Sequence, residues 1–397
     1  MSHPAASTRS ALACALALAA GLAAGASGAH AAEVATRTFH DSFPAGQPVR
    51  LANLVGRVDL VPAPAGPMTV DVTVHARGGD GAETSRLLAA LRWIKARDRQ
   101  GREELALSYP VGDYRGFCYP RPERGEHVPA FLSFMDSSQS STTYLGERVR
   151  VYSRERSGVP ILYADVKIGF PAGAALGLSN RVGLVSGGDL LGNLELGLGS
   201  SDVRIASLSG RLAADSGSGD LDLGKIRGET TITTGSGDVQ IASLIGNGEL
   251  GTGSGDVVIG RVAAGRLKVK TGSGDVTVRA GAAASVVADT GSGDVRLAKM
   301  DIEDLSADTR SGDVSVQTAL DKARRVSIET ASGDVRIAGG PGAGFDLEAH
   351  QGSGDLVVGY RDAVLRHERD KLVGARRGDG HTQIRIATRS GDCTITP

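Results

Sequence analysis

A short glycine-rich motif that recurs along the second half of the chain constrains the fold more than any other feature. The segment TGSGDV stands at residues 271–276 and again at 290–295. Gly-Asp or Ser-Asp pairs repeat around it, mostly at spacings of 18, 19 or 21 residues with a last gap of 37. Their acids are Asp189, Asp202, Asp220, Asp238, Asp256, Asp275, Asp294, Asp313, Asp334, Asp355 and Asp392. A fixed period of this length is the signature of a stacked-repeat architecture.

Aliphatic residues occupy fixed positions relative to each acid. The residue directly after it is aliphatic, as at Val239, Val257 and Val276, and so is the third, as at Ile241 and Ile259. Polar residues stand between them, which is the alternation of a strand with one buried face. Two further apolar columns precede and follow this strand. They are represented by Leu267 and Val269, and by Leu208, Ile226, Leu244 and Val262.

No single repeat of this kind can bury its own apolar face. Stacking pairs each strand with its copy in the next repeat and buries every column at once. The sequence therefore predicts an all-β protein: a right-handed parallel β-solenoid with a repeat of about 18–21 residues over residues 166–397. Each repeat would add one rung at about 4.8 Å spacing.

The Ser-Gly-Asp motif itself is interpreted as a turn between strands. Glycines 272, 274, 291 and 293 are expected to adopt positive φ, and the Ser and Asp side chains to accept hydrogen bonds from nearby backbone N–H groups. The alternative is a calcium-stabilised repeat, because stacked carboxylates repel one another and a cation would relieve that repulsion. Its ligands would be Asp238, Asp256, Asp275, Asp294 and Asp313. The turn interpretation requires no metal and no cofactor.

The first 31 residues have the pattern of a secretory signal peptide. Arg9 precedes an apolar run at 11–26, and Ala29 and Ala31 supply the small residues before a cleavage site. No later run is long and apolar enough to span a membrane. A net charge of −1 gives no reason to expect nucleic acid as a partner. We expect an exported protein, which is periplasmic, at the cell surface or secreted.

Residues 32–165 differ from the repeats and are predicted to form an N-terminal β region with a helix and an aromatic-rich insert. Residues 82–97 place Leu87, Leu91 and Ile94 at helical spacing, and this helix would cover the open N-terminal edge of the stack. Residues 109–152 concentrate the aromatic side chains. They form either a small core or a partner-binding surface, whose candidate residues are Tyr114, Phe117, Tyr119, Arg121, Phe131 and Phe134.

Two smaller features leave alternatives open. Cys118 and Cys393 are able to form a disulfide in an oxidising compartment, but Cys393 occupies a column that is aliphatic in other repeats and is better explained as a buried hydrophobe. The tripeptide Arg377-Gly378-Asp379 occurs in some adhesive proteins, yet three common residues arise easily by chance.

The segments around Asn53 and Gly56, VKIGFPAGAALGLS at 166–179, the serial TGSGDV rungs and the ending GDGHTQIRIATRSGDCTIT at 378–396 together resemble a known family. It is the bacterial putative-adhesin family of β-strand-repeat domains of unknown function. The resemblance covers nearly all of the chain after residue 31. It implies a β-solenoid that is exported or held at the cell envelope, and it supplies no catalytic residues.

We therefore expect a non-enzymatic, adhesin-like binding or envelope scaffold protein whose partner is an extracytoplasmic protein or a glycan. The alternative is a β-helical polysaccharide-acting enzyme, which needs acidic or basic groups converging in a cleft. The histidines do not cluster, and the acids form a regular column rather than an isolated pair. Acids and arginines converging beside residues 109–152 would favour the enzyme.

Overall fold

The computed structural model describes residues 33–120 and 139–397. The predicted signal peptide and the candidates Arg121, Phe131 and Phe134 lie outside these residues. Over the described residues the chain holds 28 strands and one helix, which confirms the prediction of an all-β protein. Within the same part of the chain, no helix has the length and apolar character needed to cross a membrane.

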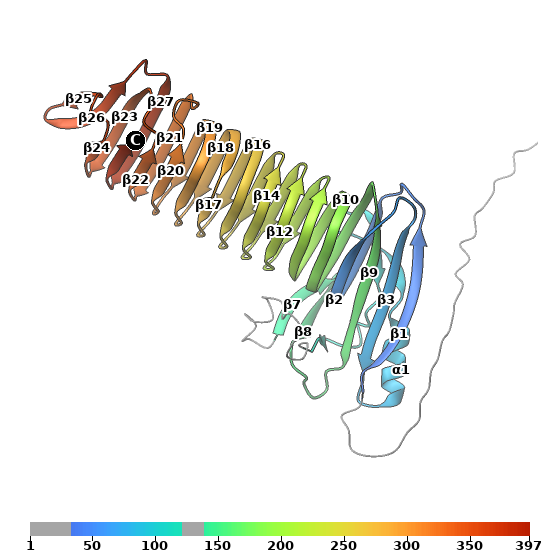
Figure 1. Cartoon of the computed structure of the whole chain (residues 1–397). Coiled ribbons are helices and arrows are strands. Elements are labelled where there is room, and N and C mark those ends of the chain that lie inside the picture. The colour runs from blue at the N-terminus through green and yellow to red at the C-terminus, as the bar shows by residue number, and fades with distance from the viewer. Residues whose placement is uncertain (1–32, 121–138) are drawn as a thin grey trace, which may run out of the picture. The chain divides into compact units, whose positions relative to one another are not determined.

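The middle of the chain is a stack of parallel strands (Figure 1). Leu221 pairs with Val203 on one side and with Val239 on the other, so the register advances by 18 residues per rung. The next rungs advance by 19 residues, as in the pairing of Val257 with Val276. These strands are β10 (Ala174–Ser209), β11 (Leu212–Ser216), β12 (Leu221–Arg227), β13 (Thr230–Thr234), β14 (Val239–Ile245), β15 (Gly248–Thr252), β16 (Val257–Thr271), β17 (Val276–Val278), β18 (Gly281–Thr290), β19 (Val295–Thr309), β20 (Val314–Thr318), β21 (Arg325–Ser332) and β22 (Val335–Ala338).

The predicted aliphatic columns form the core of this stack. Val239, Val257, Val276 and Val295 are all completely buried, and the columns of Ile241 and Leu267 are buried with them. Residues between them along the strands, such as Gln240 and Arg296, face outward. Period-two patterning alone thus identified the buried face of each rung.

The order of rungs at the C-terminal end departs from the order of the sequence. Strand β27 (Thr382–Ser390) lies between β21 and β23 (Phe345–Ser353), and β28 (Cys393–Thr396) lies between β22 and β24 (Leu356–Val358). The rung of Asp392 therefore sits between those of Asp334 and Asp355 (Figure 1). The 37-residue gap is not two successive periods, because the chain goes out one rung, makes a hairpin and returns.

That hairpin consists of β25 (Val364–Glu368) and β26 (Lys371–Arg377), joined through Arg369 and Asp370, which both adopt positive φ. Strand β26 pairs in antiparallel fashion with β23, on the side that β27 does not occupy. The hairpin therefore covers the edge of the last rung, which would otherwise expose unpaired backbone groups.

The N-terminal region builds the other end from both parallel and antiparallel strands. Strand β2 pairs with the first rung of β10, and β9, β3 and β1 follow it in that order. The elements are β1 (Ala35–Phe43), β2 (Val49–Ala63), β3 (Met68–Arg77), α1 (Gly81–Ala90), β4 (Trp93–Arg97), β5 (Glu103–Leu107), β6 (Gly116–Cys118), β7 (Gln139–Tyr144), β8 (Glu147–Tyr152) and β9 (Ile161–Pro171).

The helix predicted over residues 82–97 is shorter than expected. Helix α1 begins at Gly81, where the Asp80 side chain accepts a hydrogen bond from the Glu83 N–H, and ends at Ala90. It packs against β1 and β3, with Leu87 buried. Trp93–Arg97 instead form β4, which pairs with β5 in a hairpin. Residue Ile94 therefore lies in a strand although its spacing from Leu87 and Leu91 predicts a helix, because the antiparallel pairing with β5 provides its backbone hydrogen bonds.

Candidate functional site

The acids of the repeated motif form a continuous hydrogen-bonded column. Oδ1 of Asp256 accepts a hydrogen bond from the backbone N–H of Asp275 at 2.8 Å. In the same way, Oδ1 of Asp275 accepts from the N–H of Asp294, and Oδ1 of Asp294 accepts from the N–H of Asp313. Arg296 also contacts the carboxylates of both Asp275 and Asp294. Each of these carboxylates therefore has a structural partner, as the turn interpretation predicts.

The threonine three residues before the second glycine of each motif fixes the same turn. Oγ1 of Thr271 accepts a hydrogen bond from the Gly274 N–H at 2.9 Å and donates one to the Gly255 carbonyl at 3.2 Å. The hydroxyl thus closes its own turn and ties it to the preceding rung. This buried hydroxyl has therefore used its one donor within the turn and has none left for a ligand.

The explanation of the motif glycines by positive φ is wrong. Gly272, Gly274, Gly291 and Gly293 are not among the residues with positive φ. A Cβ at Gly274 would instead collide with the carbonyl oxygen of Gly255 one rung earlier, and a Cβ at Gly293 with that of Gly274. Glycine is needed here because successive turns stack backbone on backbone.

We expect calcium to leave the stability of the stack almost unchanged. Among the described residues no group of three or more His, Cys, Asp or Glu side chains has an arrangement that would hold a metal ion. A calcium titration followed by thermal unfolding should move Tm by no more than about a degree, because a ligand stabilises only what it binds. A large, saturable rise that EDTA reverses would instead establish Asp238, Asp256, Asp275, Asp294 and Asp313 as ligands.

The aromatic residues of the insert belong mainly to the core. Phe117 is completely buried, so it offers no surface to a partner and its assignment as a binding residue is corrected. Tyr109 and Tyr144 are also buried, and the Tyr144 hydroxyl donates to the Leu107 carbonyl at 2.7 Å. Of the other candidates, Tyr114 and Tyr119 are half-buried against this core.

The cysteines and the Arg-Gly-Asp tripeptide also have structural roles. Cys118 and Cys393 are free thiols, both buried, and Cys393 fills the aliphatic column between Val335 and Leu356. The Arg377 guanidinium bonds the Asp362 carboxylate at 2.7 Å and lies over the Tyr360 ring. Arg377 is therefore held against the protein rather than presented to a receptor.

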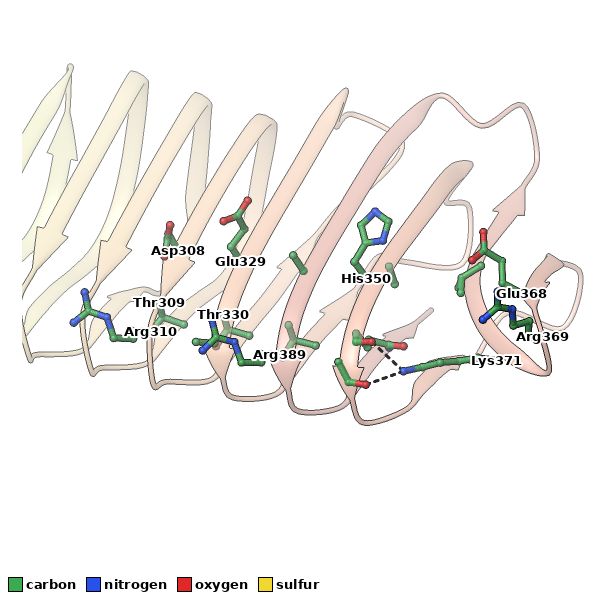
Figure 2. Close-up of a pocket in the computed structure, with 17 residues that line it drawn as sticks. Asp308, Thr309, Arg310, Glu329, Thr330, His350, Glu368, Arg369, Lys371 and Arg389 are labelled. Atoms are coloured by element: carbon green, nitrogen blue, oxygen red, sulfur yellow. Dashed lines mark hydrogen bonds between the residues drawn. The ribbon is translucent and has the colours of Figure 1, made fainter.

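A hollow of about 870 Å³ lies between the β25–β26 hairpin and the outer face of β19, β21, β27 and β23. We call it the hairpin groove, and Figure 2 shows its side chains. Arg310 and Arg389 project from the strand ends on one side, while Asp308, Glu329 and His350 stand in a neighbouring row. The hairpin contributes Glu368, Arg369 and Lys371, and Lys371 is anchored to the carbonyls of Gln351 and Gly352.

Several charges of the hairpin groove make no ion pair with any described residue, namely Arg310, Arg389, Arg369, Asp308 and Glu329. Elsewhere in the stack, Lys270, Arg296 and Arg336 are paired with carboxylates. Arg310 and Arg389 stand two rungs apart, about 10 Å, with the small Ala331 on the rung between them. These side chains are thus free to contact a ligand that lies along the groove.

A second hollow, of about 320 Å³, lies where the β4–β5 hairpin meets the first rungs. We call it the arginine cleft. The hairpin tip is held by Asp98, whose Oδ1 accepts from the N–H groups of Gln100 and Arg102. Arg102 makes two bonds to the Glu195 carboxylate, and Arg50 bonds the same carboxylate at 3.0 Å. These bonds hold the pKa of Glu195 below its usual value.

Arg181 and Glu104 line the same cleft without such partners. Burial lowers the pKa of Arg181, and the nearby positive charge of Arg99 lowers it further. Burial likewise raises the pKa of Glu104. The Nε of Arg181 is buried and has no hydrogen-bond partner, and among the described residues this side chain makes no ion pair. Perturbed, unpartnered groups in a hollow are typical of ligand sites.

Both hollows were missed in the sequence for identifiable reasons. Arg389 reaches the hairpin groove only because β27 is inserted out of order, which no spacing reveals. The arginine cleft depends on the β4–β5 hairpin, whose first strand, β4, falls within the helix that the sequence predicts over residues 82–97. The turn residues Asp98 and Gly101 were the available signal, since Gly101 adopts positive φ in this hairpin.

Comparison with known proteins finds one matching family model and several solved structures that are similar to this chain. Residues 229–396 match the family model described as Toastrack DUF4097. No curated protein sequence matches the chain. A solved structure described as a putative adhesin from Parabacteroides distasonis is 13% identical, with a TM-score of 0.38 over 90% of this chain and 97% of that one.

Two further solved structures are similar to this chain at comparably low sequence identity. One, described as a putative lipid binding protein from Parabacteroides distasonis, is 10% identical, with a TM-score of 0.33 over 90% of this chain and 96% of that one. The other, a putative adhesin from Bacteroides fragilis, is 11% identical, with a TM-score of 0.23 over 91% and 96%. Function at such distances has to be argued from the sites themselves.

Proposed function

We propose that this chain is an exported, non-enzymatic, adhesin-like binding or envelope scaffold protein. The match of residues 229–396 to the family model described as Toastrack DUF4097, a domain of unknown function, supports this proposal. The partner of the chain would be an extracytoplasmic protein or a glycan. The signal-like segment at residues 1–31 supports export, because it carries a basic start, an apolar run and small residues before Ala31.

We further infer that the repeats form a right-handed β-solenoid. Parallel pairing at intervals of 18–21 residues supports this architecture, since each strand meets its own copy in the neighbouring rung. Right-handed crossovers are the rule for parallel strands. Such a framework presents outward side chains at regular spacing, which suits it to holding extended ligands.

The hairpin groove carries the binding proposal. Its arginines Arg310 and Arg389 make no ion pair with any described residue and line one hollow together, whereas Lys270 pairs with Asp289 on the neighbouring rung. Solvent-exposed charges of this kind cost little in the free protein, so they remain available to a charged or polar partner. Arginine is also among the residues that contribute most to binding energy.

The experiment is a glycan and protein array probed with residues 32–397 and with the double variant Arg310→Ala/Arg389→Ala. We expect at least one specific ligand, and binding to it weakened by about tenfold or more in the double variant, because two arginine contacts are lost. Lys225→Ala/Arg261→Ala, which removes two exposed charges outside both hollows, serves as the matched control. Equal binding by all three proteins would place the ligand elsewhere.

A polysaccharide-acting enzyme is the second candidate, and one observation favours it. Acids and arginines do converge beside the insert, in the arginine cleft, where burial raises the pKa of Glu104 as a general acid requires. A second free carboxylate is also needed. Asp98 and Glu195 are both bonded to arginines, so Asp215, which lines the same cleft, is the candidate. Release of reducing ends from a polysaccharide, abolished by Glu104→Gln, would contradict the non-enzymatic proposal.

A further inference from the structure

The arginine cleft contains a guanidinium, that of Arg181, whose Nε has no hydrogen-bond partner and which makes no ion pair with any described residue. Arg102 and Arg50 occupy both oxygens of Glu195, and Arg102 also holds the free oxygen of Asp98. Neither carboxylate is therefore available to Arg181. The half-buried guanidinium of Arg181 destabilises the folded protein, because its charge is partly removed from water and no hydrogen bond to the buried Nε offsets this loss of hydration. Such a residue is expected where a ligand supplies the missing partner.

The surroundings of Arg181 limit which anion would fit. Glu104 and Asp215 line the same hollow and would repel a multiply charged group such as phosphate. A carboxylate carries a single charge and matches the planar fork of the guanidinium. Glu104, Asp215 and the nearby Thr231 and Thr233 offer acceptors for hydroxyl groups on the same ligand.

We propose that the arginine cleft binds a hydroxylated carboxylic acid of the uronic-acid class, with Arg181 holding the carboxylate and Glu104 and Asp215 accepting from the hydroxyls. The volume of about 320 Å³ lies at the lower end of small-molecule sites, which suits one sugar residue at a time. This proposal concerns a different surface from the hairpin groove and does not depend on it.

The test is calorimetric titration of residues 32–397 with four probes. D-glucuronate is expected to bind. D-glucose has the hydroxyls without the carboxylate, acetate has the carboxylate without the hydroxyls, and inorganic phosphate has the higher charge. All three are expected to bind at least tenfold more weakly. Equal affinity for acetate and glucuronate would overturn the assignment of the hydroxyl contacts, and tighter binding of phosphate would overturn the choice of anion.

Variants of Arg181 separate binding from folding. Arg181→Met keeps the length of the side chain and removes the charge. We expect glucuronate binding to fall by tenfold or more while Tm stays the same or rises, because an unpaired, desolvated charge is lost. Arg181→Lys should retain part of the affinity. Arg261→Ala, at an exposed position in β16 outside both hollows, should bind as the unchanged protein does. Unchanged glucuronate binding in Arg181→Met, or a fall in its Tm of several degrees, would show that Arg181 serves the fold instead.

Discussion

Val276→Asp is expected to unfold the central rungs. Val276 is completely buried and pairs with Val257 and Val295 in the aliphatic column of the neighbouring rungs. An aspartate there has no partner for its charge, and the loss of stability should exceed about 4 kcal/mol. Thermal unfolding followed by circular dichroism should show a strongly lowered Tm or a loss of strand signal at room temperature.

The matched control for this change is Thr277→Asp. Thr277 is the next residue on the same strand, points outward and lies beside Arg296 in the following rung. The same new charge should change stability by no more than about 0.5 kcal/mol there. Equal effects at the two positions would contradict the register that places Val276 inside.

Gly274→Ala is expected to destabilise the stack although it adds a single methyl group. The new Cβ would collide with the Gly255 carbonyl oxygen, a backbone atom that also accepts the Thr271 hydroxyl. The two turns would have to move apart, at a cost of about 1–3 kcal/mol. Chemical denaturation measured by circular dichroism should reveal this loss.

Gly251→Ala is the control for the glycine prediction. Gly251 lies in β15, where an added Cβ would meet backbone oxygens only at 3.9 Å, an ordinary contact. Replacement there should be neutral or slightly stabilising, since alanine restricts the unfolded chain. If Gly274→Ala is equally harmless, then close stacking of the turns is not the reason for the motif glycines.

The repeated part of the fold was predictable because its signal is local and recurs. Each Asp fixes the phase of its rung, and the columns that include Val239 and Ile241 then identify the buried face without reference to other rungs. The reason for the glycines was not predictable, because the contact of Gly274 with Gly255 exists only once the rungs are stacked.

The candidate sites were not predictable, because they depend on contacts between distant parts of the chain. Arg181 is recognisable as a candidate site residue only in the folded structure. There the turn from Asp98 to Arg102 lies against β10, and Arg102 and Arg50 both bond the Glu195 carboxylate. The spacing of Leu87, Leu91 and Ile94 favoured one long helix, and the tertiary pairing of β4 with β5 overrode it. Aromatic content drew attention to the insert, although Phe117 and Tyr144 serve its core.

The inserted position of β27 and β28 sets the order in which the chain is able to fold. Rungs in the middle of the stack form between residues about 19 positions apart, whereas β28 meets β22 across 58 residues. Loop closure over that distance is slower than between neighbours. Because β23 and β24 pair with β27 and β28, the rung that holds Asp355 joins the stack only after these two strands have paired with β21 and β22. Until that step, this end of the stack stays open.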